Sequence, residues 1–271
     1  MTRVIINSHY IDRRISGLSR YARQIESALA ASGFEVRRLG MAAVLPHGLL
    51  KNTFVRKLAT LGLELAAPAI IKGRDRSVVH VSPAYSVPIG SHSARSAVVI
   101  HDLIFNDMPQ YYALSERLYF GANLALLRRS KCRIVVPSPY VGEQVRTLLH
   151  CHADRIYVIP PYSSLPAAER APVSSRYMIC LSNAHPRKNL NATVAGFLAS
   201  GAPAQGYQLV IAGNFETRPA YLQDRVKVIE GLDDQALASM IANASALLLF
   251  SASEGFGIPV VEAAVLAGKL I

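Results

Sequence analysis

The amino-acid sequence predicts an α/β fold made of two Rossmann-like, doubly wound domains that face each other across a cleft. Short apolar runs alternate with helical patterns from one end of the chain to the other, which is typical of parallel sheets with helical crossovers. A stretch rich in Pro, Ser and Ala, residues 160–175, interrupts this alternation and has the composition of a linker. The 271 residues suffice for two domains of ordinary size. We therefore expect an N-terminal domain over residues 1–165 and a C-terminal domain over residues 166–271.

The N-terminal half shows apolar runs bounded by turn residues, which is the signal for buried strands. The expected strands lie near residues 3–6, 35–39, 78–81, 97–101, 133–136 and 156–159. Helical patterns fall near residues 18–32, 50–66, 114–129 and 139–149. Ser138 and Pro139 open the last of these helices, as the N-cap and a first-turn residue.

The same alternation restarts after the linker. We expect strands near residues 177–181, 207–212, 226–229 and 246–250, and helices near residues 189–199, 233–243 and 259–267. Doubly wound folds bind ligands at the carboxyl ends of their strands, so the cleft between the two domains is where chemistry is expected.

Positive charge is concentrated in the N-terminal half. Residues 1–172 hold 22 Lys and Arg against 11 Asp and Glu, whereas residues 173–271 hold 7 of each kind. A basic half favours an anionic partner such as a membrane surface, a phosphorylated lipid or nucleic acid, and a plain solvated surface explains it equally well. The apolar stretch 58–71 contains Glu64 and Pro68 and is too short to span a bilayer. It fits a core helix better than an interfacial membrane helix.

The cysteines and the start of the chain indicate a cytoplasmic protein. Cys132, Cys151 and Cys180 lie far apart without a CxxC pair, which argues against a disulfide framework or a zinc site. A strand-like run begins at Val4 and leaves no room for a signal peptide. The sequence has no Asp-x-Asp pair and no cluster with metal-ligand spacing, so neither a metal nor another cofactor is expected.

Two glutamates near the end of the sequence surround a glycine-containing turn. Glu254 falls in the loop between a strand and a helix, and Glu262 falls in the expected first turn of that helix. A helix N-terminus attracts phosphate, while Gly255 and Gly257 let the backbone approach a ligand. Carboxylates beside an anion site are suited to accept hydrogen bonds from hydroxyls, as on the two sugars of a nucleotide sugar. Alternatively, Glu262 only complements the helix dipole and the glycines only turn the chain.

The segment NASALLLFSASEGFGIPVVEAAVLAG resembles the E-x7-E region of the large retaining glycosyltransferase family with the GT-B fold. This is the family 4 type, with bacterial mannosyl- and other hexosyltransferases. GLDDQALASMIANA, YQLVIAG and SNAHPRKNL resemble neighbouring parts of the family, and GLSRYARQIESAL and VVIHDLIF resemble its first domain. The resemblance covers nearly the whole chain, and it implies a nucleotide-diphosphate sugar as donor.

The resemblance implies a role for each matching residue of the second domain. Glu254 would face the hydroxyls of the transferred sugar, and Glu262 would bind the ribose. Arg187 and Lys188 would neutralise the diphosphate, where a fixed cation stabilises the charge that develops on the leaving group. An exposed basic turn is the plain alternative for these two residues. The amides that would help in donor binding belong to Gly255, Phe256, Gly257 and Ile258.

One departure from the family concerns the diphosphate. Ser182 and Asn183 stand where many members have Gly-Arg. One expected cation is therefore missing, and Arg187 is the candidate to replace it.

Two residues of the first domain complete the predicted site. His101 closes an apolar run at a strand end, and the resemblance implies that it lies beside the anomeric centre. As a lone histidine it is alternatively a core residue with a backbone partner. Gly17 would bring amides near the phosphates or the acceptor, with Arg20 and Tyr21 on the acceptor side. A plain loop glycine is the alternative.

Together these observations predict a retaining glycosyltransferase that moves a hexose, mannose-like, to a hydroxyl of a glycan or lipid-linked acceptor. No residue stands out as a covalent nucleophile, so we expect attack on the same face, assisted by the leaving diphosphate. A nucleotide-sugar or phosphate-binding module without turnover is the alternative. Nucleic acid is not an expected partner, because the basic residues are scattered without a motif. Peripheral contact with the inner membrane face is expected. Family members continue beyond the position of Ile271, so we expect the second domain to be incomplete.

Overall fold

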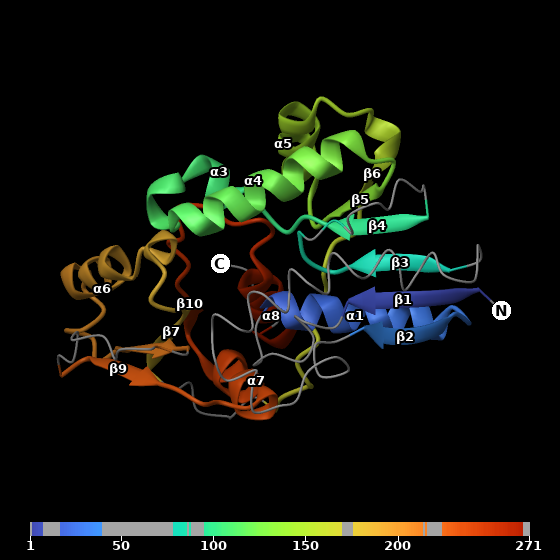
Figure 1. Ribbon diagram of the computed structural model, residues 1–271. Helices are drawn as coiled ribbons and strands as arrows, with labels where there is room; N and C mark the ends of the chain where they lie inside the picture. Colours follow the sequence, from blue (N-terminus) through green and yellow to red (C-terminus); the bar gives the residue numbers. More distant parts are fainter. Residues whose placement is uncertain are drawn as a thin grey trace, which may run out of the picture. The chain divides into compact units, whose positions relative to one another are not determined.

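The structure, a computed structural model, describes residues 2–7, 17–39, 78–85, 87, 95–169, 176–213, 215 and 224–267. The chain divides into two compact units, Met1–Pro161 and Tyr162–Ile271. Each unit contains one parallel sheet (Figure 1). The division falls four residues before the boundary expected from the sequence. The expected helix at 50–66 and the apolar stretch 58–71 lie outside the described residues.

The sheet of the N-terminal unit has the strand order β2-β1-β3-β4-β5-β6, and all its strands are parallel. These strands are β1 (Arg3–Asn7), β2 (Glu35–Leu39), β3 (Val79–Ser82), β4 (Ser96–Val99), β5 (Arg133–Val136) and β6 (Ile156–Val158). The helices are α1 (Gly17–Ala31), α3 (Ile104–Asp107), α4 (Leu114–Arg129) and α5 (Pro139–Leu149), with 3₁₀ helices at Pro109–Tyr111 and Ala153–Arg155.

Apolar residues of central strands and helices form the main core of this unit. Val98 of β4 and Ile134 of β5 have no exposed area, and they belong to one cluster with Leu127 of α4 and Val145 of α5. Helix α5 begins as the sequence predicts, because Ser138 Oγ accepts a hydrogen bond from the backbone N–H three residues later, at 3.3 Å.

In the described residues of the C-terminal unit, four parallel strands form a sheet in the order β10-β7-β8-β9. They are β7 (Tyr177–Leu181), β8 (Gln208–Ala212), β9 (Val226–Ile229) and β10 (Ala246–Leu247). The helices are α6 (Leu190–Ala199), α7 (Asp234–Asn243) and α8 (Ile258–Ala267), with a 3₁₀ helix at Pro186–Lys188. Ile179 of β7 and Ile241 of α7 are buried in one core cluster, and α7 and α8 lie side by side.

The α/β fold with parallel sheets is confirmed, and each strand expected from the sequence is present. The bounds agree within one or two residues, except at β10, where the strand expected at 246–250 contains Ala246–Leu247 alone. This strand lies at the edge of its sheet and has one partner, β7. The Leu248 N–H still donates to the Ile179 carbonyl oxygen at 2.8 Å, and the chain then leaves the sheet as a loop.

Candidate functional site

The C-terminal sheet contains a point where the chain changes direction across the sheet. From β7 the chain moves outward through β8 to β9, and it then returns to place β10 on the other side of β7. The loops after β7 and β10 therefore leave neighbouring strands at the same edge, and open α/β sheets bind ligands at such a switch point. Arg187 and Lys188 lie in the first of these loops, and Glu254 lies in the second.

Arg187, Lys188 and Glu254 form one charged cluster. Lys188 Nζ lies 2.6 Å from Glu254 Oε1, and Arg187 Nη1 lies 3.1 Å from Glu254 Oε2, while the side chains are only 11%, 19% and 23% exposed for Lys188, Arg187 and Glu254. The same loops also meet through the backbone, since the Ala252 N–H donates to the Arg187 carbonyl oxygen at 2.8 Å. Arg187 Nη1 also donates to the Ser253 carbonyl oxygen at 3.3 Å. The sequence predicted each of the three charged residues for a donor site but did not predict their mutual pairing.

The basic turn after β7 has a defined backbone. His185 Nδ1 accepts a hydrogen bond from the Arg187 N–H at 3.3 Å, and Asn183 Oδ1 accepts one from the His185 N–H at 3.1 Å. Asn189 has a φ of 49°, a left-handed conformation that asparagine tolerates better than most residues, and α6 begins at the next residue. Because the side chains of both cations are mostly buried, the structure disfavours the plain exposed turn. Asn183, which departs from the family pattern, helps to build this turn.

Burial and charge act in opposite directions on Glu254. Desolvation raises its pKa, whereas the charges of Arg187 and Lys188 and the Lys188 hydrogen bond lower it, and the net pKa lies below the ordinary value of a glutamate. Glu254 is therefore ionised at neutral pH and compensates the two cations. A second anion at this cluster would be repelled by the carboxylate unless it displaced it.

The loop after β10 ends at a position that requires glycine. Gly257 has a φ of 81°, in the left-handed region that favours glycine, and α8 begins at the next residue, Ile258. The amides of Gly255, Phe256 and Gly257 thus lead into the N-terminus of a ten-residue helix, where anions are stabilised. This segment is therefore the part of the expected donor site that offers backbone amides instead of charged side chains.

The structure corrects the expected position of Glu262. Because α8 begins at Ile258, Glu262 is the fifth residue of the helix and lies beyond its first turn. It is 1% exposed, whereas the sequence predicted a carboxylate on the rim of the sheet. The interaction with a helix dipole fades beyond the first turn, so the alternative role for Glu262 is weakened as well.

Gly213, directly after β8, marks a close approach of two strand ends that was not singled out from the sequence. A Cβ at this position would lie 1.8 Å from the Ser182 carbonyl oxygen, so only glycine fits there. The Gly213 N–H donates to the Ile229 carbonyl oxygen at 3.1 Å. The available sequence signal was a glycine immediately after an apolar run.

In the N-terminal unit, His101 follows β4 and is held by a backbone oxygen. Its Nε2 lies 2.6 Å from the Pro83 carbonyl oxygen. A carbonyl only accepts, so Nε2 carries the proton and Nδ1 is the remaining acceptor of the neutral ring. Burial lowers the pKa of His101, and the Pro83 bond and the charge of Asp102 oppose this only in part. The ring is therefore uncharged at neutral pH.

Tyr85 frames His101 and was not recognised from the sequence. Its hydroxyl donates to the Asp102 carbonyl oxygen at 2.9 Å and accepts from the Asp102 N–H at 3.0 Å. Burial, together with the charge of Asp102, raises the pKa of Tyr85 well above its ordinary value, and its φ of 40° is unusual for a residue other than glycine. The rings of Tyr85 and Tyr21 lie 6.0 and 5.4 Å from that of His101.

Gly17 and its neighbours lie at the start of α1. Gly17 is the first residue of this helix, and residues 8–16 before it lie outside the described residues. Tyr21 is 2% exposed, and its hydroxyl donates to the Ile159 carbonyl oxygen. It therefore packs inside the N-terminal unit, and the expectation that it lines the acceptor side is wrong. Gly17 and His101 belong to the N-terminal unit, and the other predicted site residues belong to the C-terminal one.

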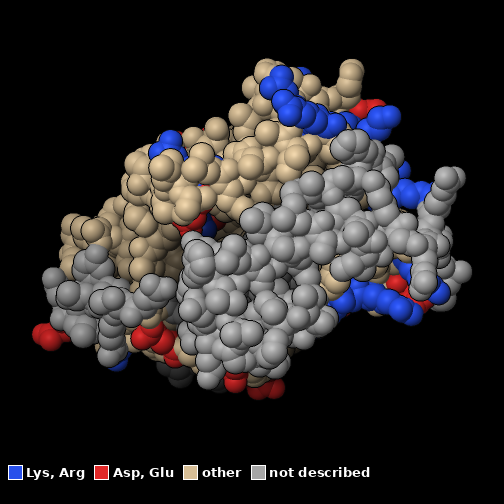
Figure 2. Space-filling model, in the orientation of Figure 1, with Lys and Arg blue, Asp and Glu red and all other residues tan. Residues whose placement is uncertain are grey.

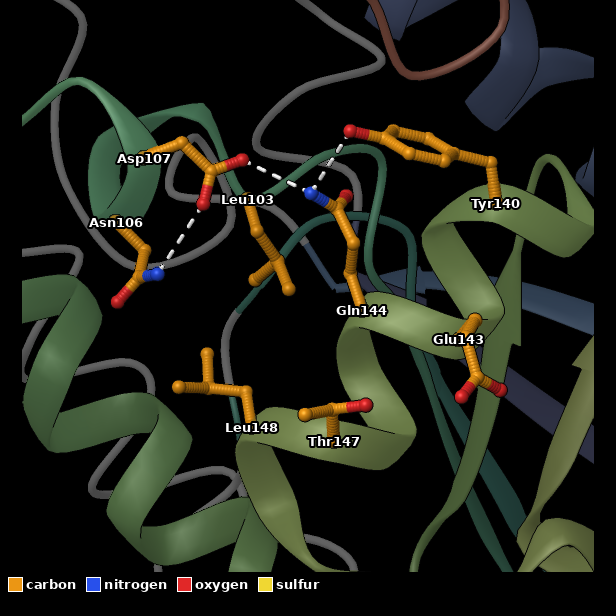
Figure 3. A pocket seen from close by; sticks show the side chains of 8 residues that line it. All are labelled: Leu103, Asn106, Asp107, Tyr140, Glu143, Gln144, Thr147 and Leu148. Carbon is orange, nitrogen blue, oxygen red and sulfur yellow. Dashed lines mark hydrogen bonds between the residues drawn. The ribbon is translucent and has the colours of Figure 1, made fainter.

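A hollow of about 330 Å³ lies between α3 and α5. One of its lining residues, Leu103, follows His101 closely in the sequence. Figure 3 shows Gln144 of α5 pointing toward Asp107, with Leu103 and Leu148 directed into the space between the helices. Gln144 Nε2 donates to Asp107 Oδ2 at 2.9 Å and to the Tyr140 hydroxyl at 3.2 Å. The other lining residues are Asn106, Glu143 and Thr147. Among the described residues, the lining holds two carboxylates and no cation, so the hollow suits a neutral polar group and disfavours a phosphate.

The described part of the chain shows neither a metal-binding cluster nor a membrane-spanning helix. No group of three or more His, Cys, Asp or Glu there could hold a metal ion. In the same residues, no helix combines the length and the apolar character needed to cross a bilayer.

Comparison with known proteins associates the C-terminal unit with a family. Residues 163–269 match the family Glycosyl transferases group 1, which covers nearly all of this unit and no part of the other. No curated protein matches the chain.

Solved structures share the fold over most of the chain. WaaG, a glycosyltransferase involved in lipopolysaccharide biosynthesis, has a TM-score of 0.67 at 14% identity, covering 96% of this chain and 78% of that one. Sucrose-phosphate synthase from Thermosynechococcus elongatus has a TM-score of 0.73 at 16% identity, covering 99% and 80%. The pneumococcal O-GlcNAc transferase GtfA in complex with UDP and GlcNAc has a TM-score of 0.53 at 16% identity, covering 73% and 42%. At these identities the likeness shows the fold, which is that of GT-B glycosyltransferases.

Proposed function

We propose that this chain is a retaining glycosyltransferase that moves a hexose, mannose-like, from a nucleoside-diphosphate sugar to a hydroxyl of a glycan or lipid-linked acceptor. The observation that carries the proposal is the charged cluster of Arg187, Lys188 and Glu254 at the switch point of a unit that matches group 1 glycosyl transferases. A neighbour in fold acts in lipopolysaccharide biosynthesis, and another was solved with UDP and GlcNAc. Polysaccharide or lipopolysaccharide synthesis is the proposed setting.

In this proposal the diphosphate of the donor replaces the Glu254 carboxylate as the partner of the two cations. Without donor, the Glu254 carboxylate pairs with both Lys188 and Arg187 and offsets one of their two positive charges. The diphosphate takes its place beside the two cations, and the carboxylate becomes free to accept hydrogen bonds from the hydroxyls of the transferred sugar. The amides of Gly255, Phe256 and Gly257 and the N-terminus of α8 at Ile258 add further donors. Protein groups thus supply the positive charge that the leaving diphosphate needs, and no metal or other cofactor is part of the proposal.

Glu262 is proposed to bind the ribose. Because it is 1% exposed, this role requires the loop between β10 and α8 to shift when the nucleotide enters. The requirement separates Glu262 from Glu254, whose side chain is 23% exposed and already lies at the surface of its loop.

The proposed chemical step needs no covalent nucleophile. The acceptor oxygen forms a bond to the anomeric carbon on the face from which the diphosphate departs, the bond between that carbon and the phosphate oxygen breaks, and the acceptor proton goes to a phosphate oxygen. Lys188 and Arg187 stabilise the negative charge that develops on the leaving group. We propose that Gly17 brings amides near the phosphates and that His101 lies beside the anomeric centre as a neutral ring, with Nδ1 available to accept a hydrogen bond. The hollow between α3 and α5 is the proposed seat of the acceptor sugar.

The proposal is tested by nucleotide release and by thermal stability. The chain is incubated with GDP-, UDP- and dTDP-hexoses, and both its melting temperature and the release of nucleoside diphosphate are measured. One donor class is expected to raise the melting temperature by mass action and to release its diphosphate faster with acceptor present. A stabilised protein that releases nothing would be a binding module, and a protein that responds to no donor would overturn the proposal.

Two matched variants test whether the activity depends on the charged cluster. Glu254→Gln removes the carboxylate charge with little change of shape, and it is expected to reduce transfer while strengthening the binding of free nucleoside diphosphate, because both cations lose their partner. Glu35→Gln breaks a solvent-exposed ion pair with Arg3 on the N-terminal sheet and is expected to change neither quantity. A cytoplasmic location at the inner membrane face completes the proposed function.

A further inference from the structure

The 3₁₀ helix Pro186–Lys188 carries both cations of the charged cluster, and its N–H groups have defined partners. Pro186 has no N–H to place, and the Lys188 N–H donates to the His185 carbonyl oxygen at 2.9 Å. The Arg187 N–H is therefore the donor that this helix leaves to a side chain, and His185 Nδ1 accepts from it at 3.3 Å. His185 thus holds the backbone N–H of both cations, one through its ring and one through its carbonyl group.

The main chain of Arg187 is also tied to the loop that carries Glu254. The Arg187 carbonyl oxygen accepts from the Ala252 N–H at 2.8 Å, so this residue is held by His185 on one side and by the loop after β10 on the other. The side chains of both cations reach Glu254 from this fixed backbone. Loss of the ring contact would release one of the two sides, and the cationic side chains would lose part of their fixed direction.

Asn183 makes the same kind of contact in the same segment. Its Oδ1 accepts from the His185 N–H at 3.1 Å, two residues later in the sequence, and the His185 ring accepts from the Arg187 N–H with the same spacing. An amide oxygen and an imidazole nitrogen therefore fix successive parts of one turn. A ring nitrogen that accepts carries no proton, so the neutral His185 ring holds its proton at Nε2.

A second histidine at the start of a 3₁₀ helix lacks this contact. His152 precedes the helix Ala153–Arg155 with φ −67° and ψ 145°, close to the φ of −69° and ψ of 128° of His185. Its side chain makes no hydrogen bond that caps the helix. The ring contact of His185 is therefore a property of the turn that carries the cations, and a histidine before a 3₁₀ helix does not make it by default.

Few other cations are present near this turn. On the face shown in Figure 2, the blue atoms of Lys and Arg lie mostly over the N-terminal unit. Among the described residues of the C-terminal unit, the remaining Lys and Arg are Arg176, Arg225 and Lys227. Arg176 and Arg225 directly precede β7 and β9, at the amino ends of these strands, and Lys227 lies within β9. An anion at the carboxyl ends of β7 and β10 therefore depends on where Arg187 and Lys188 are held.

We propose that His185 is a positioning residue for the diphosphate of the donor, an inference that rests on the proposed function. Its neutral ring holds the Arg187 N–H and so fixes the direction in which Arg187 and Lys188 meet the diphosphate. A turn that is already fixed before binding loses less conformational freedom when the ligand arrives. The ring acts through the two cations and does not itself touch the donor.

The test measures the affinity of the folded chain for GDP, UDP and dTDP by calorimetric titration well below the melting temperature. His185→Leu removes the acceptor, and it is expected to raise the dissociation constant of the diphosphate that binds by roughly fivefold, the effect of one lost hydrogen bond. His185→Asn supplies an amide oxygen, as Asn183 does, and is expected to stay within about twofold of the unaltered chain. His152→Leu is the matched control and is expected to leave the dissociation constant unchanged.

Nuclear magnetic resonance gives a second readout that needs no ligand. The ¹⁵N signals of the neutral His185 ring are expected to show the proton on Nε2 and an unprotonated Nδ1. A proton on Nδ1 would overturn the proposal, and this measurement decides even where His185→Leu does not fold.

The remaining outcomes separate this inference from the proposed function. A lower melting temperature of His185→Leu with an unchanged dissociation constant would show a purely structural role and overturn the inference. Failure of His185→Asn to keep the affinity would overturn it too, because the imidazole would then contact the diphosphate directly. Diphosphate binding without hexose transfer would overturn the proposed function alone. Hexose transfer with equal affinities of His185→Leu and the unaltered chain would overturn this inference alone, and binding of none of the three diphosphates would overturn both.

Discussion

The two predicted halves of the site use opposite kinds of interaction. In the C-terminal unit, Arg187, Lys188 and Glu254 hold one another by charge. In the N-terminal unit, His101 is held by a neutral hydrogen bond to a backbone oxygen and by two tyrosine rings. The first arrangement brings opposite charges together in one cluster, and the second keeps a buried ring uncharged.

The difference also concerns how each region responds to a lost side chain. Removing one member of an ion-paired cluster leaves partly buried charges without compensation. Removing a hydroxyl from a neutral network leaves a hydrogen-bonding group unsatisfied, which costs less. Charge changes in the C-terminal unit should therefore have the larger effects.

The largest effect is expected for Lys188→Ala. By analogy with the loss of a single donor that stabilises a developing anion, the rate of transfer should fall by about 10²–10³. Steady-state kinetics with the donor class that raises the melting temperature in the proposed screen measure the loss. Lys227→Ala, at an exposed position of β9, is the matched control and should retain full activity. Equal activity of the two variants would contradict a role for Lys188 in transfer, because the charged cluster would then be structural only.

A second large effect is expected from pH, through His80 of β3. His80 is 2% exposed, and burial lowers its pKa to about 4. The ordinary value of 6.5 applies to the unfolded chain, which therefore takes up a proton first as the pH falls. Stability is full above about pH 6.5 and should decrease by about 3 kcal/mol between pH 6.5 and pH 4.

Denaturant unfolding at several pH values measures this loss. In the His80→Leu variant the decrease between pH 6.5 and pH 4 should be much smaller, whereas His152→Gln, at an exposed position, should keep it. A decrease that survives in His80→Leu would assign it to other groups.

A smaller effect is expected for Tyr85→Phe. The variant loses both hydrogen bonds to the Asp102 backbone, which should cost about 1–3 kcal/mol of stability. If Tyr85 positions His101, kcat should fall while the KM for the donor stays unchanged, and the pKa of His101 measured by NMR should shift.

Tyr177→Phe provides the matched control for Tyr85→Phe. The Tyr177 hydroxyl donates to the Met240 carbonyl oxygen at 2.6 Å in the other unit. This variant should lose comparable stability without moving the pKa of His101. A shift in both variants, or in neither, would exclude a positioning role for Tyr85.

The smallest effect is expected at Gly257. Gly257→Ala keeps enough space, since the nearest atom to the new Cβ is Val260 Cγ2 at 3.8 Å. The cost arises from the φ of 81° and should be about 1–2 kcal/mol. Gly196→Ala within α6, where no atom lies within 4 Å, should instead stabilise the chain by about 1 kcal/mol. Unfolding curves that move in the same direction for both variants would contradict this account.

Most of the fold was predictable because its signals are local. The apolar runs and the caps occupy neighbouring positions, so the strands were expected within a few residues, as were the described α-helices apart from the short α3, which was not predicted. The same patterns put Lys188 and Glu254 after neighbouring strands of the C-terminal sheet, and parallel strands place such residues at a common edge. They put His101 after a strand of the N-terminal sheet. Glu262 was misplaced because its burial depends on the packing of α8 against segments such as α7, which local patterns do not specify.

The sequence by itself determined the α/β architecture, the parallel strands and the kinds of side chain available at their carboxyl ends, because spacing along the chain encodes these properties. Only the tertiary structure decided which of those side chains meet. Lys188 and Glu254 are 66 positions apart, and they pair because β10 returns to the side of β7. The burial of Glu262 and the frame that Tyr85 builds around His101 likewise depend on contacts between distant segments, which local patterns do not specify.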